Sequence, residues 1–283
     1  MKLLAPFSTN KNINSLFFNL IGIQPFRYLF AKLLYNLKIL VNGNLEFSDF
    51  RKNGYSIQEN FLEKEQFDKI KEEFNKLIND KEYTTQENGN INVTVVKINK
   101  IDKKEKYPEI CSLLHNEKIL NFFKKNELRK SPQIHGVIER VKVVNDYKDP
   151  GPSDFHHDTF HNTFKTWLYI SDIKDEDGPL HVVPNTHKFS LKRLFREWTN
   201  SIAISLKKYS SDGADVAGSL RYGNSFKEKQ KLDKTAIKFL LKKNTFLKVN
   251  THGLHRRGDA KIGGMRDSIH IYTRENPFKV FFQ

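Results

Sequence analysis

The sequence predicts a mainly β protein with flanking helices, built on a jelly-roll core of the double-stranded β-helix, cupin-like type. Short segments rich in β-branched and aromatic residues recur between residues 88 and 273, separated by turn signals such as Asn-Gly and Asp-Glu-Asp-Gly-Pro. Long irregular connections join these segments, which favours a barrel over alternating βαβ units. A chain of 283 residues, 38% of them hydrophobic, suffices for one large domain with an appendage.

Residues 13–41 form the most apolar part of the chain and contain no acidic residue. Their formal charges are all basic: Arg27, Lys32 and Lys38. Pro25 divides the segment, and neither half reaches the ~20 apolar residues that a membrane-spanning helix needs. The second half, residues 26–41, is typical of a helix in an anionic membrane interface. The alternative is a helix that caps the protein body with its Lys and Arg in solvent.

The elements that follow are predicted from periodicity. Residues 46–80 predict a strand or turn and then an amphipathic helix, with Phe67, Ile70, Phe74 and Leu77 on its apolar face. A short helix is expected at residues 108–125. Strands are expected at residues 88–99, 134–144, 165–171, 180–183, 245–250 and 268–273. The predicted organisation is an N-terminal helical segment, 1–45, followed by a jelly-roll domain, 46–283.

The chain is strongly basic, with 48 Lys and Arg against 33 Asp and Glu, a net charge of +15. Within residues 188–243 the strand pattern stops, and fourteen basic residues stand against five acidic ones, a net charge of +9. We therefore predict a basic helical insert, or lid, that binds an anionic partner. The alternative is a helical face whose lysines are simply in solvent. No helix-turn-helix, zinc-finger or RNA-binding motif is found, so nucleic acid is not the expected partner.

Cysteine usage and the start of the chain predict a location. Cys111 is the single cysteine, so no internal disulfide forms. The first residues lack the apolar core and cleavage site of a secretory signal. We expect a cytoplasmic protein, and residues 13–41 would allow peripheral contact with the inner face of a membrane.

Two clusters of residues carry candidate chemistry. In the first, His156 and Asp158 are two positions apart, so an extended backbone projects both from one face toward one metal ion. Two histidines with one carboxylate suit iron(II), so a third ligand must come from elsewhere. The second cluster, in residues 250–274, offers His252 and His255. In isolation, a His-x-Asp pair arises often by chance.

Arg266 lies shortly after these histidines in a strand-like run, and its planar guanidinium suits a carboxylate. Ser268, two residues on, shares its face and could donate a second hydrogen bond to the same group. The simpler interpretation is a surface ion pair for Arg266 and ordinary polar loop positions for the histidines.

At residues 155–274, interrupted by the basic insert, the chain resembles the phytanoyl-CoA dioxygenase family of iron- and 2-oxoglutarate-dependent oxygenases. Three motifs carry the resemblance in the family's order: Phe155-His156-His157-Asp158, Gly178-Pro179-Leu180 and Val183-Pro184-Asn185-Thr186-His187-Lys188. The pair Asn185-Thr186 departs from the Gly-Ser usual in the family. The family's distal histidine lies about ten residues before its arginine, which selects His255 over His252.

The resemblance implies a role for each candidate. His156, Asp158 and His255 would be the iron ligands and catalytic centre. Arg266 would hold the distal carboxylate of 2-oxoglutarate, with Ser268 assisting. No partner for the other end of 2-oxoglutarate is evident, and Thr166 and Trp167 are only nearby candidates. His187 is expected to stabilise its loop, and His157 and His161 to face either substrate or solvent.

The activity implied is that of a dioxygenase that uses Fe(II), 2-oxoglutarate and O2 and releases succinate and CO2. Related halogenases lack the carboxylate ligand, so Asp158 favours hydroxylation. The basic insert favours an anionic substrate, either a small molecule or one linked to lipid or glycan. An alternative is a non-catalytic membrane- or glycan-binding protein on a degenerate oxygenase fold. A metal enzyme of this shape with no need for oxygen would leave Arg266 unexplained.

Overall fold

The computed structural model describes residues 15–42, 49–89, 91–145, 155–206, 220–222 and 226–278. Within them, twelve strands form two sheets. The strands are β1 (Tyr55–Gln58), β2 (Thr84–Glu87), β3 (Ile91–Lys97), β4 (Ile134–Val143), β5 (Phe155–His157), β6 (Phe164–Tyr169), β7 (Leu180–Val182), β8 (Leu220–Tyr222), β9 (Ile237–Lys238), β10 (Phe246–Asn250), β11 (His255–Arg257) and β12 (Met265–Thr273).

The α-helices lie before the strands, between them and in the basic insert. They are α1 (Leu16–Leu20), α2 (Ile23–Asn42), α3 (Asp49–Asn53), α4 (Lys64–Leu77), α5 (Pro108–Ser112), α6 (Glu117–Glu127), α7 (Leu191–Ser205) and α8 (Phe226–Thr235). In the described part of the chain, no helix combines the length and apolar character needed to cross a bilayer.

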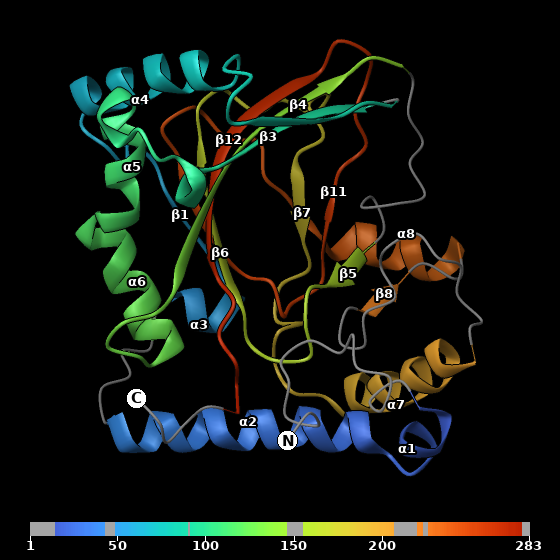
Figure 1. Ribbon diagram of the computed structural model, residues 1–283. Coiled ribbons are helices and arrows are strands. Elements are labelled where there is room, and N and C mark those ends of the chain that lie inside the picture. The colour runs from blue at the N-terminus through green and yellow to red at the C-terminus, as the bar shows by residue number, and fades with distance from the viewer. Residues whose placement is uncertain are drawn as a thin grey trace.

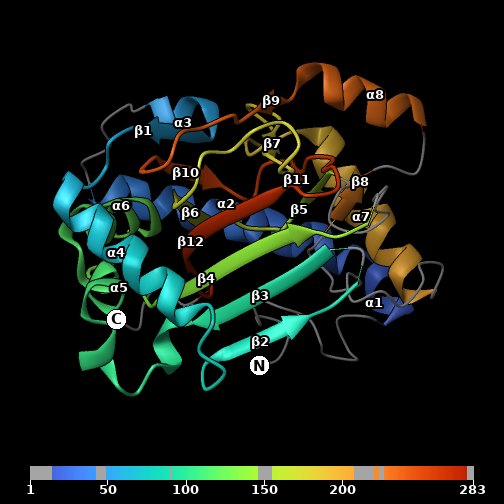
Figure 2. The same ribbon diagram turned by 90° about the horizontal axis from the view of Figure 1, so that it is seen from above.

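The two sheets have the order β1-β10-β6-β12-β4-β3-β2 and β8-β5-β11-β7-β9, with antiparallel pairing throughout. Figure 1 shows helices α4, α5 and α6 against one face of the large sheet, the small sheet on its other side, and α2 along the base. Figure 2, from above, shows β2, β3, β4 and β12 side by side. The predicted jelly-roll core with flanking helices is confirmed.

The largest hydrophobic core lies between the large sheet and its covering helices. The predicted apolar face of α4 enters it: Phe67, Ile70, Phe74 and Leu77 are all buried. Burying one such side chain contributes about 1.5–3 kcal/mol. A second core fills the space between the sheets, where Trp167 and Tyr169 of β6 meet Leu180 and Val182 of β7. Alternate side chains of β6 thus enter different cores, which fixes which face of the strand looks at the small sheet.

Two sequence predictions are wrong in detail. The N-terminal segment is divided into α1 and α2, but the break falls at Ile21 and Gly22 and not at Pro25. Pro25 lies in the first turn of α2, where a missing N–H costs no helical hydrogen bond. Residues 188–243 do contain helices α7 and α8, but they also contribute β8 and β9 to the small sheet. These strands have three and two residues, too few to leave a period in the sequence.

The sequence also does not predict β5 and β11, each of three residues. Both lie in the small sheet, and β11 pairs with β5 on one side and β7 on the other. Their pairing brings distant parts of the chain together, which a local pattern cannot reveal.

Candidate metal centre

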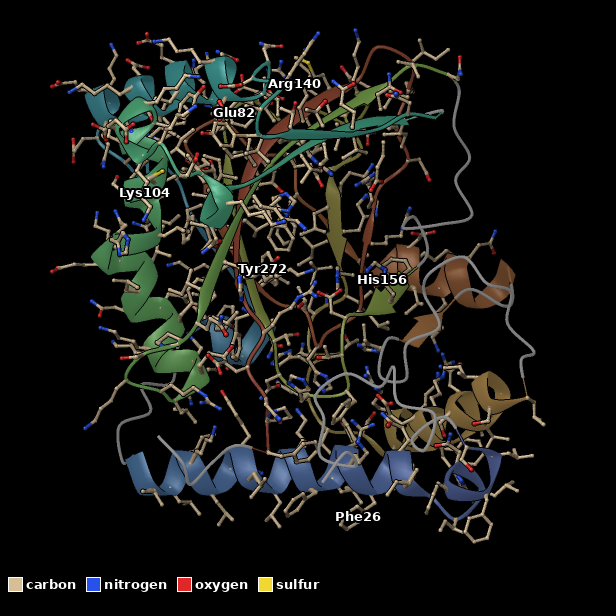
Figure 3. The ribbon with its side chains drawn as sticks, viewed as in Figure 1. Phe26, Glu82, Lys104, Arg140, His156 and Tyr272 are labelled. Atoms are coloured by element: carbon tan, nitrogen blue, oxygen red, sulfur yellow. The ribbon has the colours of Figure 1, made fainter. Side chains whose placement is uncertain are left out.

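Strand pairing in the small sheet brings the two motif regions together. His255 of β11 is the register partner of His156 of β5. Asp158 follows β5, and its backbone N–H donates to the carbonyl of Thr251 at 3.1 Å. The rings of His156 and His255 are 4.4 Å apart between centroids. Two segments almost a hundred residues apart in the chain therefore bring His156, Asp158 and His255 together. Figure 3 shows where His156 lies in the fold.

The distances within this cluster fit one metal ion. Oδ1 of Asp158 lies 3.7 Å from Nε2 of His156 and 3.5 Å from Nε2 of His255. One donor atom from each residue lies within 4.8 Å of the other two. Metal–ligand bonds of about 2 Å place neighbouring ligands of one ion roughly 3–4 Å apart. Two imidazoles and one carboxylate are the donor set of non-haem iron(II) centres.

Hydrogen bonding sets the ring orientation of His255. Its Nδ1 lies 3.0 Å from the carbonyl oxygen of Gly253. A carbonyl only accepts, so Nδ1 carries the proton and Nε2 keeps its lone pair for a metal. His252 is fully buried elsewhere, with Nδ1 3.1 Å from the carbonyl oxygen of Thr159, and does not belong to the cluster.

A lysine that the sequence analysis missed lies beside the carboxylate. Nζ of Lys165 on β6 is 2.6 Å from Oδ2 of Asp158. Burial by itself raises the pKa of Asp158, but the charges of Lys165 and the two histidines outweigh it and hold that pKa well below its ordinary value. Lys165 shares a strand face with Trp167, on a strand that begins six residues after Asp158, so the period-two pattern could have found it.

Arg266 lies on β12 among a second set of polar groups. Nη1 donates to the carbonyl of Gly178, and Nη2 lies 3.3 Å from Oε1 of Glu139. Ser268 shares this strand face, and its hydroxyl is 2.9 Å from Nε2 of His270. Arg266 and Ser268 are both buried. The carboxylate of Glu139 thus holds the guanidinium of Arg266 on the face of the large sheet that is turned away from the helix-covered core.

Burial and neighbouring charges set the protonation states of Glu139 and His270 in this second set. Burial raises the pKa of Glu139, but the neighbouring charges of His270, Arg266 and Arg257 outweigh it and lower the pKa to about 2. Burial lowers the pKa of His270 to about 4. At neutral pH the site therefore contains a carboxylate, a guanidinium and a neutral imidazole. The sequence analysis missed Glu139 because only the register of β4 on β12 places it opposite Ser268.

The structure does not bring Thr166 to this site. Thr166 alternates with Lys165 and shares the face of Phe164 and Leu168, whose side chains enter the helix-covered core. Its hydroxyl donates to the carbonyl of Ile271 at 3.1 Å. Trp167, the other candidate, faces the small sheet and packs in the second core.

The other histidines considered in the sequence analysis, His157, His161 and His187, lie outside the metal-binding cluster. Nε2 of His187 lies 2.9 Å from the carbonyl oxygen of Arg51, so the prediction that it stabilises its loop is confirmed. His157 and His161 are both buried, at 1% and 4% exposure, so neither faces solvent. His157 points away from the cluster, with Nδ1 2.5 Å from the carbonyl oxygen of His252.

Fold and site together define a double-stranded β-helix protein with a two-histidine, one-carboxylate cluster. The sequence profile of the phytanoyl-CoA dioxygenase (PhyH) family matches residues 50–212, more than half of the chain. The chain belongs to this family of iron- and 2-oxoglutarate-dependent oxygenases, and iron and 2-oxoglutarate are its cofactor and co-substrate. The profile match includes His156 and Asp158 but ends before His255 and Arg266, which the fold brings to them.

Solved structures share the fold. One is the epimerase SnoN in complex with Fe3+, alpha ketoglutarate and nogalamycin RO, 14% identical, with a TM-score of 0.50 over 79% of this chain and 80% of that chain. Another is EctD from S. alaskensis in its apoform, 12% identical, with a TM-score of 0.50 over 79% of this chain and 74% of that chain. No curated protein matches the chain.

Proposed function

We propose that the chain is an Fe(II)- and 2-oxoglutarate-dependent hydroxylase whose metal is held by His156, Asp158 and His255. The observation that carries this proposal is the convergence of these three donors within 4.8 Å of one another. Bound there, iron with 2-oxoglutarate and O2 supplies the oxidising power to hydroxylate a substrate, with release of succinate and CO2. Asp158 as a ligand supports hydroxylation over halogenation.

The surrounding residues bind, orient and exclude water. We propose that Arg266 binds the distal carboxylate of 2-oxoglutarate, since Gly178 and Glu139 already fix the direction of its guanidinium. Ser268 on the same strand face would assist. Trp167 and Tyr169 are buried between the sheets, where Trp167 packs on His270, and would exclude water from this side of the site.

Turnover of the co-substrate tests this proposal. Purified protein with Fe(II), ascorbate, O2 and 2-oxoglutarate is expected to release succinate, and His255→Ala is expected to reduce the rate to background. His115→Ala is a matched control, because His115 is exposed in the helical region beyond the large sheet. Equal succinate release by wild type and His255→Ala would refute the assignment of the ligands.

We further propose that the substrate is anionic, a small molecule or one linked to lipid or glycan, and that residues 188–243 help to bind it within the domain 46–283. Two observations support this. Strand β8 of the insert pairs with β5, the strand that carries His156. Helix α8 of the insert adds the exposed lysines Lys231 and Lys234. Basic residues in a segment that pairs with the metal-bearing strand would attract phosphate, sulfate or carboxylate groups.

Pairs of compounds that differ by one phosphate or sulfate test the substrate class. The anionic member is expected to stimulate succinate release at lower concentration at low salt. The double variant Lys231→Glu, Lys234→Glu should lose that preference. Its control, Lys118→Glu with Lys124→Glu, reverses two exposed charges on α6 and should retain it. An unchanged preference in the insert variant would count against the proposal.

The non-catalytic alternative receives no support from the site. A degenerate oxygenase would be free to lose a ligand or the carboxylate-binding arginine. Here the metal-binding donors lie together, and Arg266 is buried on the adjoining sheet. Membrane contact, the other part of that alternative, is compatible with catalysis and has a separate structural basis.

A further inference from the structure

Helix α2 has its polar side turned toward the protein. Gln24 and Arg27 are each 1% exposed, and the half-buried Lys32 turns its ammonium inward, 3.1 Å from the carbonyl oxygen of His187. On the outer side, five large apolar residues follow one another at spacings of three or four, which places them in one stripe. They are Phe26, Leu29, Leu33, Leu37 and Leu40, with exposed fractions of 58%, 43%, 54%, 41% and 76%. Figure 3 shows Phe26 on the side of α2 that faces away from the sheets.

The inward polar side is held by a specific network, so this orientation of α2 is built into the sequence. Arg27 donates to Oε1 of Gln24 at 2.8 Å, and Gln24 donates to Glu197 of α7 at 3.1 Å. Glu197 also accepts a hydrogen bond from Nε of Arg193 at 2.8 Å. The guanidinium of Arg27 stacks over the ring of Phe160, 4.5 Å from its centroid. Rotating α2 to bury its apolar stripe would break these hydrogen bonds and remove the partners of the buried polar groups.

Two neighbouring helices have the same character. In α1 and the turn after it, Phe17, Leu20 and Ile21 are 66%, 52% and 66% exposed. Helix α7 packs against both α1 and α2 and presents Leu191, Phe195 and Trp198 at spacings of four and three. Most of the large hydrophobic residues that are exposed in the described part of the chain lie on these three helices or immediately beside them. An apolar surface of this size marks an interaction site.

The charges around this surface favour an anionic partner. Helices α1 and α2 contain no acidic residue, and the single acid of α7, Glu197, is fully buried. Lys188 and Lys192 are exposed at the edge, in a segment held to α2 by stacking of Phe189 on Tyr28 at 6.0 Å. The whole chain carries +15. Like charges at this edge would oppose each other in a symmetric pair of chains.

We propose that the outer face of α1, α2 and α7 is a docking surface for an anionic lipid bilayer, on which the oxygenase lies without crossing it. A helix of this length lies flat over roughly 30 Å, with its apolar stripe in the acyl boundary and lysines at the headgroups. The sequence allowed such contact through the basic residues of residues 26–41, beside the alternative of a capping helix. The structure assigns it to the apolar stripe, because Arg27 and Lys32 face inward. This proposal goes beyond the oxygenase function and does not depend on it.

Co-sedimentation of the full chain with vesicles tests the surface. Wild type is expected to bind vesicles of phosphatidylcholine with phosphatidylglycerol, and binding should weaken on phosphatidylcholine alone. The double variant Leu33→Asn, Leu37→Asn should reduce the vesicle-bound fraction by about tenfold or more. The matched control Ile57→Asn, Ile262→Asn removes two comparably exposed apolar side chains elsewhere, 43% and 58% exposed, and should bind as wild type does.

Further measurements separate the remaining outcomes. Lys188→Glu with Lys192→Glu should weaken binding to the anionic vesicles selectively. Circular dichroism and the anaerobic iron and 2-oxoglutarate complex should be unchanged in each variant, so loss of binding is not loss of fold or site. The proposal is overturned if wild type fails to bind anionic vesicles, or if both double variants bind equally. It is also overturned if vesicle-free sedimentation shows a dimer that Leu33→Asn, Leu37→Asn dissociates, since the surface is then a self-interface.

Discussion

The ammonium of Lys165 lies 2.6 Å from Oδ2 of Asp158, the carboxylate of the metal-binding motif. Lys165 comes from the large sheet, whereas Asp158 and its two histidine neighbours belong to the small sheet and the turn after it. The ion pair therefore joins the two sheets at the centre of the site. It also places a cation beside the carboxylate that would hold the ferrous ion.

Removing this cation should make the protein depend on iron for stability. Lys165→Met leaves the carboxylate of Asp158 without its partner, which costs about 2 kcal/mol of unfolding free energy in the metal-free protein. Anaerobic Fe(II) should restore more stability to the variant than to wild type, because metal binding to the folded state compensates the carboxylate. Thermal unfolding with and without Fe(II) measures both effects. Lys248→Met, on the other side of the sheet, is the control, and equal gains in both proteins would contradict the prediction.

Arg266→Gln should weaken co-substrate binding without weakening metal binding. Loss of a charged, paired hydrogen bond to a carboxylate costs about 3 kcal/mol, so the Kd for 2-oxoglutarate should rise roughly 100-fold. Anaerobic equilibrium titrations give both dissociation constants. Arg140→Gln is the matched control, since Arg140 is on the adjacent strand but pairs with Asp267 at 2.8 Å. A similar rise of the Kd for 2-oxoglutarate in the control would contradict a specific role for Arg266 in binding the co-substrate.

Glu127, at the end of α6, should make stability fall as the pH rises. Burial raises its pKa from 4.5 to about 7. The folded state therefore favours the protonated form, so the stabilisation is complete below pH about 4.5 and is lost as the pH rises through about 7. The shift corresponds to about 3 kcal/mol. Urea unfolding at pH about 5 and about 8 should show wild type losing that amount relative to Glu127→Gln. Parallel pH dependence of the two proteins would rule out this role.

Substitution of a core phenylalanine and of one on the proposed docking surface should have different effects on stability. Phe74→Ala should cost about 3–5 kcal/mol of unfolding free energy, because its ring is fully buried between α4 and the large sheet. Phe26→Ala should cost less than about 1 kcal/mol, because its ring is 58% exposed and stacks on Phe30 of the same helix. Urea unfolding compares them. A large loss for Phe26→Ala would mean that the outer face of α2 is packed against another part of the chain.

Residues with a local signal were predictable from the sequence. The apolar face from Phe67 to Leu77 follows from helical spacing. The long strands and the common face of His156 and Asp158 follow from the alternation of side chains along a strand. The choice of His255 over His252 followed from family spacing, and the structure places His255 in the cluster.

What the sequence could not give depends on pairing between distant segments. Glu139 reaches Arg266 only through the register of β4 on β12. Strands β8 and β9 are too short for a periodic signal, so the insert was read as helical alone. The inward placement of Arg27 depends on Glu197, 170 positions away, and inverts the usual expectation that a helix turns its charges to water.

We expect His156, Asp158 and His255 to hold iron next to a bound 2-oxoglutarate. Anaerobic addition of Fe(II) and 2-oxoglutarate, followed by visible absorption, reports on this complex. Wild type and the exposed-residue control Asp175→Ala should develop the charge-transfer band of the chelate, and Asp158→Ala and His255→Ala should not. A band of full intensity in Asp158→Ala, or its absence from wild type, would contradict the account.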